Sequence, residues 1–223
     1  MSRGVTQLAS GSAQKRPSVV SPISVFAKSI FWALFGLMTL SAFLFSSLPI
    51  LKPSHPMHDL LYSQRWMLFP HIAGGLSALI LGPLQFSTRI RQRNPARHRL
   101  LGKLYVGAVS VAAPLGPMMA WHYPAFFPYS VTTNATLWLI TTFSAFLTAR
   151  NRQFEQHRRW MARSYAMAST FVLPRVPVPI AAYNNMSLEA SSYALLIFSL
   201  FALLAADLLV DCSIGGKRQE TLH

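Results

Sequence analysis

Long runs without a charged residue dominate the pattern of hydrophobic and polar positions after residue 28. Runs free of Lys, Arg, Asp and Glu cover residues 29–51, 66–88 and 104–149. Because a helix needs about 20 apolar residues to cross a bilayer, each of the first two runs predicts one spanning helix. The third run is about twice as long as one crossing needs, and its proline-containing middle, residues 122–128, predicts a turn between two helices.

Two further apolar runs complete the pattern. Residues 160–183 are interrupted by Arg175 and by three prolines, and residues 191–210 carry Asp207 near their end. The whole pattern therefore predicts an all-α bundle of six transmembrane helices over residues 28–212. An even number of crossings places both termini on the same side of the membrane.

The composition agrees with a chain folded in lipid. Hydrophobic residues make up 52% of the chain and charged residues only 12%, and the mean hydropathy is +0.34. The first 27 residues are rich in Ser, Gln, Lys and Pro without an apolar period, which predicts a disordered cytoplasmic leader. Residues 213–223 are expected to form a cytoplasmic tail.

The basic residues predict the orientation of the bundle. Seventeen of the 20 Lys and Arg residues fall on one side, with four before the first span, six between spans 2 and 3, five between spans 4 and 5, and two in the tail. The positive-inside rule makes this side cytoplasmic, so we expect a protein of the cytoplasmic membrane. The rule also explains the net charge of +14 without a nucleic-acid surface. The basic loops are expected to contact anionic lipid head groups.

The two large basic loops share one pattern, Arg-x-Arg-x4-His-Arg, at residues 91–99 and 150–158. The offset of 59 residues places His98 and His157 in equivalent positions. One interpretation is a duplication in which spans 2 and 3 form one hairpin and spans 4 and 5 a second, related by rotation about the membrane normal. The alternative is a chance pattern in Arg-rich loops, with each histidine capping a helix or meeting lipid phosphates.

Two acidic residues near the cytoplasmic end of the last span, Asp207 and Asp211, predict ion pairs with the basic loops. Arg163 is the expected partner, because spans 5 and 6 follow each other in the chain and these residues belong near the same membrane surface.

Three stretches carry a family resemblance: HIAGGLSALILGPLQF at residues 71–86, HRLLGKLY at 98–105 and HRRWMARSY at 157–165. Together they resemble the bacterial membrane family catalogued as domain of unknown function 2306, over about residues 71–175. The resemblance implies a multi-pass helical bundle. It implies no particular reaction, so the expected chemistry rests on the residues themselves.

Any cofactor must be held by histidines or carboxylates. The single cysteine, Cys212, excludes an intramolecular disulfide and the cysteine sites of zinc, iron–sulfur clusters and c-type haem. Prolines beside His55 and His58 deny this pair a helical frame, so no metal site is predicted there. Axial ligands of a b-type haem are the stronger hypothesis for the histidines at helix ends or within spans, namely His71, His98, His122 and His157.

His71 and Arg175 are predicted at similar depth in the outer half of the bundle. A polar side chain costs less free energy in a cavity shared with another polar group than in lipid, so both are expected to face a common cavity. His71 would ligate a haem iron while Arg175 holds a propionate, or both would bind a quinone carbonyl or an anionic lipid head group. His122 and Tyr183 are expected at the outer rim of this site.

Three functions stay open at this point. The first is a b-type haem or quinone redox protein, although no span carries two histidines at the spacing of about 13 residues that is typical of membrane dihaem cytochromes. The second is a small-molecule or lipid permease, and the third a non-catalytic scaffold or accessory subunit. Whether the protein is an enzyme, a homo-oligomer or part of a larger complex also stays open. No hydrolase or nucleotide-binding motif occurs in the chain.

Overall fold

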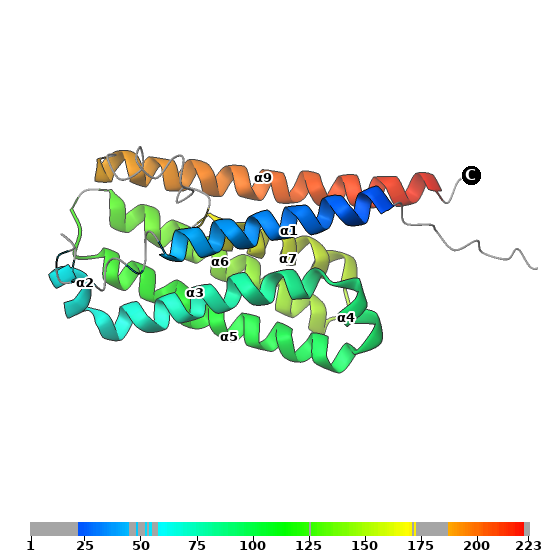
Figure 1. Cartoon of the computed structure of the whole chain (residues 1–223), viewed down its shortest axis with the longest axis horizontal. Coiled ribbons are helices and arrows are strands. Elements are labelled where there is room, and N and C mark those ends of the chain that lie inside the picture. Colours follow the sequence, from blue (N-terminus) through cyan, green and yellow to red (C-terminus); the bar gives the residue numbers. More distant parts are fainter. Residues whose placement is uncertain are drawn as a thin grey trace, which may run out of the picture.

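The computed structural model describes residues 22–44, 48, 52, 54, 58–124, 126–170, 172 and 187–220, and the side chains of residues 22–29, 58, 60, 61 and 212–220 are not described. Every regular element in this part of the chain is helical (Figure 1). The helices are α1 (Pro22–Ala42), α2 (His58–Ser63), α3 (Arg65–Phe86), α4 (Thr88–Arg93), α5 (Pro95–Ala120), α6 (Phe127–Arg150), α7 (Phe154–Ser169) and α9 (Leu188–Glu220). The predicted all-helical membrane bundle is confirmed.

Three helices are long and apolar enough to cross a membrane by composition alone: α3, α5 and the part of α9 over Leu188–Asp211. α6 has 24 residues but carries several hydroxyl and amide side chains. α7 has 16 residues and begins with a basic first half, while the apolar part of α1 covers Ile30–Ala42. Six long helices are therefore present, and the crossing of a membrane by all six stays a prediction.

The core of the bundle is a ring of four helices. α3 packs on α5, α5 on α6, α6 on α7, and α7 on α3, so that α5 and α7 occupy diagonal positions. α9 packs against α6 and α7. Figure 1 shows that the start of α1 and the end of α9 lie at the same end of the bundle as α4. We call this end the basic end, since it also holds the first turns of α5 and α7.

Several boundaries differ from the sequence-based expectation. α1 begins at Pro22, inside the predicted leader, because proline suits the first turn of a helix, where its missing N–H is not needed. α9 continues to Glu220, through most of the predicted tail. The first basic loop contains the short helix α4 and the first turns of α5. In the predicted fifth span α7 ends at Ser169, and apart from Thr170 and Val172 the residues that follow up to 186 lie outside the described residues.

Close approach of α3 and α5 depends on Gly74. A Cβ atom added at Gly74 would lie 2.7 Å from the carbonyl oxygen of Ala108 and 3.1 Å from the Cβ of Ala112. Gly82, two turns further along α3, leaves room for the ring of Tyr165, which a Cβ atom there would overlap. Small residues are what allow helices in lipid to pack this closely, because the surrounding lipid gives no hydrophobic gain for burying larger ones.

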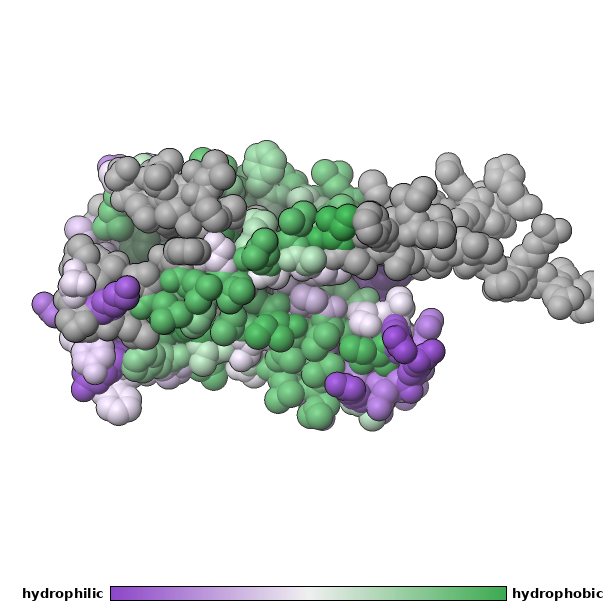
Figure 2. Space-filling model, in the orientation of Figure 1, coloured by the Kyte–Doolittle hydropathy of each residue, from purple (hydrophilic) through white to green (hydrophobic). Residues whose placement is uncertain are grey.

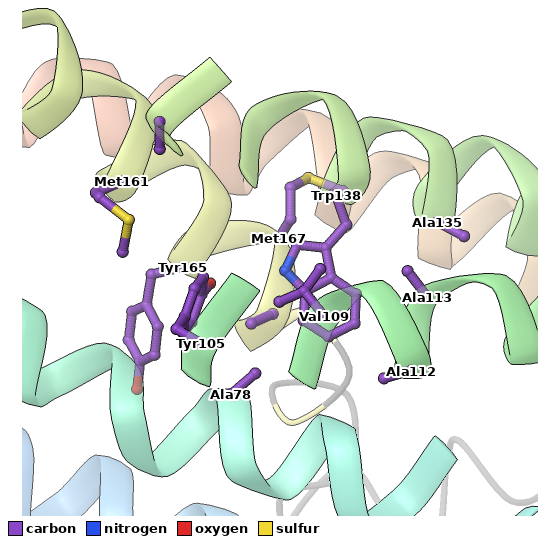
Figure 3. Packing of buried hydrophobic residues seen from close by; sticks show 12 residues of the cluster. Ala78, Tyr105, Val109, Ala112, Ala113, Ala135, Trp138, Met161, Tyr165 and Met167 are labelled. Carbon is purple, nitrogen blue, oxygen red and sulfur yellow. The ribbon is translucent and has the colours of Figure 1, made fainter. Parts of the chain in front are cut away.

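Tyr105 and Trp138 are among the largest fully buried side chains of the core (Figure 3). The Tyr105 hydroxyl shares a hydrogen bond of 2.9 Å with Ser164, and Ser164 shares one of 2.7 Å with Thr142. Thr142 donates its proton to the Trp138 carbonyl oxygen at 2.7 Å, so it must accept from Ser164. Ser164 in turn must accept from Tyr105. The protons of this hydroxyl chain therefore point in one direction.

Two ion pairs join α7 to α9. Arg163 Nε and Nη2 donate to the two carboxylate oxygens of Asp207 at 2.7 and 3.1 Å, and Arg159 lies 2.8 Å from an oxygen of Asp211. The prediction that Arg163 pairs with an aspartate of the last span is confirmed. The bidentate pair is also the less exposed one, with 39% of the Asp207 side chain exposed against 58% for Asp211.

Substituting Gly74 with alanine is expected to destabilise the bundle by about 1–3 kcal/mol, because the added methyl group must push α5 away. The neighbouring Gly75 faces open space and provides the matched control. Gly75→Ala should leave the unfolding temperature of the detergent-solubilised protein unchanged or slightly raised. Equal unfolding temperatures for the two variants would contradict this packing.

Substituting Asp207 with asparagine is expected to lower the free energy of unfolding by about 1 kcal/mol, because the Arg163 guanidinium then loses its bidentate charged partner. Asp211→Asn should cost clearly less, since that carboxylate is more exposed and is bound by a single nitrogen. Denaturant titration of both variants in the same micelles makes the comparison. A larger loss for Asp211→Asn would show that the ion pairs are ranked wrongly.

Candidate histidine site at the basic end

His98 and His157 lie at the same end of the bundle, each in the first turn of its helix. α5 begins at Pro95 and α7 at Phe154, so the two helix starts are 59 residues apart, the same offset as the two histidines. The His98 ring interacts electrostatically with His157 and with Arg91. The repeat therefore places the two histidines at one end of the bundle, on diagonal helices of the core.

The His157 ring is held in one orientation by the backbone of the preceding helix. Its Nδ1 lies 2.8 Å from the carbonyl oxygen of Ala145, so Nδ1–H donates and Nε2 carries the lone pair. This is the usual arrangement for a histidine that binds a metal or accepts a proton through Nε2. The geometry thus fixes which nitrogen of His157 is available for chemistry.

His98 differs from His157 in this respect. Its Nδ1 is buried without a hydrogen-bond partner among the described residues. The amide of Gln85 donates to the His98 carbonyl oxygen at 3.5 Å, and a Cβ atom at Gly102 would lie 3.2 Å from Gln85 Oε1. Gln85 thus fills the space between α3 and α5 beside the histidine. A buried ring nitrogen without a partner is unusual.

Two tyrosines join the hairpins. Tyr105 of α5 reaches Ser164 of α7, and these residues are again 59 apart. Tyr165 of α7 donates to the Leu79 carbonyl oxygen of α3 at 3.2 Å, so each hairpin sends a tyrosine into the other (Figure 3). A rotation that exchanges the hairpins would turn the α5–α7 contact into an α7–α5 contact, so the two contacts are not copies of each other and the duplication stays a prediction.

His71 lies in the second turn of α3, near the other end of the bundle. Its Nδ1 donates to the Ala112 carbonyl oxygen at 2.7 Å, and a Cβ atom at Gly116 would lie 3.5 Å from its Cε1. The half-buried ring therefore faces α5, as expected for an inward-pointing group. Phe86 ends α3 15 residues later, about 22 Å away along the helix axis, so His71 cannot share a ligand with His98 and His157.

The structure brings none of the other predicted site residues that it describes to these groups. Arg175 and Tyr183 lie outside the described residues, so their convergence with His71 stays a prediction. His122 is exposed in the turn after α5. His55 also lies outside the described residues, and the side chain of His58 is not described. Over the described residues, no group of three or more His, Cys, Asp or Glu side chains is placed to hold a metal ion.

A buried amide cluster escaped the sequence analysis. Asn134 of α6 is fully buried and donates to Thr170 Oγ1 at 3.3 Å and to Ser199 Oγ at 2.5 Å, which joins α6, α7 and α9. Its Oδ1 has no hydrogen-bond partner among the described residues. In the sequence, these residues are visible only as uncharged polar positions inside apolar runs. Predictions based on charged residues and histidines do not include them.

Comparison with known proteins addresses the family. No curated protein and no solved structure matches the chain. The family model described as predicted membrane protein (DUF2306) matches residues 68–212, which include both hairpins, the two histidines of the basic end and most of α9. The chain therefore belongs to the DUF2306 family of predicted membrane proteins.

Proposed function

We propose that this membrane protein is a redox protein of the cytoplasmic membrane that binds a b-type haem or a quinone at the basic end. One observation carries the proposal: His98 and His157 occupy equivalent positions on the diagonal helices α5 and α7. Axial ligation of a haem between helices of a bundle requires two imidazoles that approach from opposite sides. Each hairpin of the repeat would supply one of them.

The side chains around the pair suit this role. His157 presents Nε2 because Nδ1–H is bound to the Ala145 carbonyl oxygen. Ligation would also give a role to His98, whose buried Nδ1 lacks a partner among the described residues. Arg91 interacts electrostatically with His98, and an arginine there would hold a propionate of haem. A bound haem would supply one-electron transfer. For a quinone, the hydroxyl group of its reduced form would donate a hydrogen bond to Nε2 of His157.

His71 is a second candidate ligand in the outer half of the bundle. Its ring has the same Nδ1–H bond to a backbone carbonyl as His157. We retain the proposal that Arg175 and His71 serve one ligand, with His122 and Tyr183 at its rim. Two sites, one near each membrane surface, would suit electron transfer across the bilayer. A permease or scaffold role needs neither histidine in this orientation.

Full-length protein purified from haem-supplied cells is expected to show the Soret band and the sharp reduced α-band of low-spin, bis-histidine haem. His98→Ala and His157→Ala should each abolish the low-spin spectrum, because either change removes one axial ligand. Gln156→Ala, at an exposed position beside His157, is the control and should keep the spectrum.

For a quinone, the solvent extract of the purified protein should contain about one quinone per chain, lost in the same two variants. Protein that carries neither haem nor quinone would contradict the redox proposal. A permease or a scaffold would then be the better interpretation.

The proposed orientation predicts the compartment of both termini. Six crossings with a cytoplasmic basic end place the C-terminus in the cytoplasm, as the distribution of Lys and Arg requires. In a bacterial host, alkaline phosphatase fused after His223 should be inactive, and green fluorescent protein at the same point should fluoresce. An active phosphatase fusion would overturn the orientation and with it the location of the histidine pair.

A further inference from the structure

Exposed tyrosine and tryptophan side chains gather at the end of the bundle opposite the basic end. Figure 1 shows α2 and the starts of α3 and α9 at this end, where α5 also ends and α6 begins. Among the described residues, the exposed Tyr and Trp side chains are Tyr62, Trp66, Trp121, Tyr129 and Tyr193, and all of them lie here. We call this end the aromatic end.

Ring contacts join these side chains from one helix to the next. Trp121, which caps the end of α5, lies edge-on to Tyr129 of α6 with the ring centroids 6.3 Å apart. The Phe126 ring stacks on Tyr129 at 6.1 Å and on Tyr193 of α9 at 5.6 Å. The connection between α5 and α6 and the start of α9 therefore present one continuous aromatic surface.

A second aromatic group lies at the start of α3. The central carbon of the Arg65 guanidinium lies 5.0 Å from the ring centroid of Tyr62 and 5.6 Å from that of Trp66. Arg65 Nη1 also donates to the Tyr62 carbonyl oxygen at 3.2 Å. These contacts hold the charge of Arg65 at the level of the exposed rings, as expected of a long side chain that keeps its charged head in a wet layer.

The distance from the aromatic end to the basic end matches the thickness of a bilayer. At about 1.5 Å per residue, α5 rises about 27 Å from Lys103 to Trp121. α6 rises about 32 Å from Tyr129 to Arg150. Both values are close to the roughly 30 Å of the hydrocarbon core. The exposed rings and the basic residues of these two helices thus lie one hydrocarbon thickness apart.

Between these two levels the surface of the bundle is apolar. Figure 2 shows hydrophobic side chains over the middle of the visible face and hydrophilic ones toward its two ends. The exposed positions of α5 between the two levels carry no polar side chain, and they are Leu104, Gly107, Val111, Pro114 and Met118. The exposed residues of α9 from Ile197 to Leu209 are apolar as well. Such a surface suits contact with lipid tails.

We propose that the exposed tyrosines and tryptophans of the aromatic end form a belt that binds the membrane–water interface of one leaflet, while the basic end lies at the other leaflet. Tyr and Trp suit an interface because an apolar ring carries a polar O–H or N–H group. The rings lie among the upper acyl chains, and the polar groups bond to lipid carbonyls and water. The belt sets the depth of the bundle, and α6 crosses the whole hydrocarbon layer.

The distribution of the belt residues favours a lipid interface over a partner protein. Trp66 belongs to α3, which packs on α5 and α7, whereas Tyr193 belongs to α9, which packs on α6 and α7. The exposed rings therefore come from different sides of the bundle. A partner seated on one side would cover only some of them, and a lipid interface surrounds them all.

Spin labels test the depth of the bundle in vesicles of phosphatidylcholine and phosphatidylglycerol. The full-length chain with Cys212→Ser carries one nitroxide, attached to a new cysteine at Val111, Ile140 or His122. Val111 and Ile140 are exposed in the middle of α5 and α6, and His122 is exposed at the aromatic end. The first two labels should be relaxed far more strongly by oxygen than by a water-soluble nickel complex. The His122 label should lie near the lipid phosphates and be relaxed by both.

Replacing belt residues tests what holds this depth. Trp66→Leu/Trp121→Leu removes both indole N–H groups and keeps apolar side chains, so the Val111 label should move by about 2 Å or more along the membrane normal. Trp66→Tyr/Trp121→Tyr keeps interfacial side chains and should leave the label in place, which also serves if the leucine variant does not fold. Phe69→Leu is the control, because Phe69 is exposed on α3 and has no polar group.

Three results would overturn the proposal. Strong relaxation of the Val111 or Ile140 label by nickel would place the middle of these helices outside the hydrocarbon layer. Protection of the His122 label from both reagents, with spin–spin broadening, would mean that a second copy covers the aromatic end. An unchanged label depth in the leucine variant would mean that the belt does not position the bundle. None of these outcomes depends on the redox proposal, because no belt residue belongs to a histidine site.

Discussion

The constraint on which the structure depends is that lipid cannot satisfy a polar group, so a polar side chain within the bundle is most stable with a partner inside it. Most hydroxyls of the core have such a partner on another helix or on their own backbone, whereas Ser41 Oγ and Asn134 Oδ1 have none among the described residues. Tyr105, Ser164 and Thr142 form a chain that ends on a carbonyl oxygen, and Asn134 joins three helices. His71 donates across to α5. These bonds help to fix how α5, α6 and α7 face one another, and thereby where the histidines of the basic end are placed.

The residues that serve packing and those that could serve chemistry lie at different depths along the membrane normal. Inside the bundle, glycines and hydroxyls serve close approach, as Gly74 does for α3 and α5. Charged and imidazole groups collect in the first turns of α5 and α7 at the basic end, where water and lipid head groups reduce the cost of a charge. A histidine in such a turn is both anchored by a rigid helix and accessible from one side. This placement suits the proposed electron transfer.

The sequence predicted the helical bundle and the pairing of Arg163 with an aspartate of the last span, because apolar runs and opposite charges can be recognised along the chain. It also predicted the hairpin repeat, which stays a prediction. It placed the start of α1 six residues late because it used the last charged residue, Lys28, as a boundary, and helices in membrane proteins extend past the hydrocarbon. It ranked the histidine at the outer end above the pair at the basic end because the pairing of His98 with His157 needs the diagonal packing of α5 and α7. The Asn134 cluster joins residues 36 and 65 apart in the chain, which no local pattern reveals.

The two hairpins differ in electrostatics, and this difference gives the basic end its polarity. In the second hairpin the aspartates of α9 neutralise Arg159 and Arg163. α9 follows the second hairpin directly and packs on α6 and α7, so it compensates charge only on that side. In the first hairpin, with its additional helix α4, Arg89, Arg93 and Arg97 form no ion pair with a described carboxylate. His98 and His157 therefore lie between the surface that the aspartates of α9 neutralise and the positive surface at α4. A negatively charged group bound between the two histidines would be drawn toward α4.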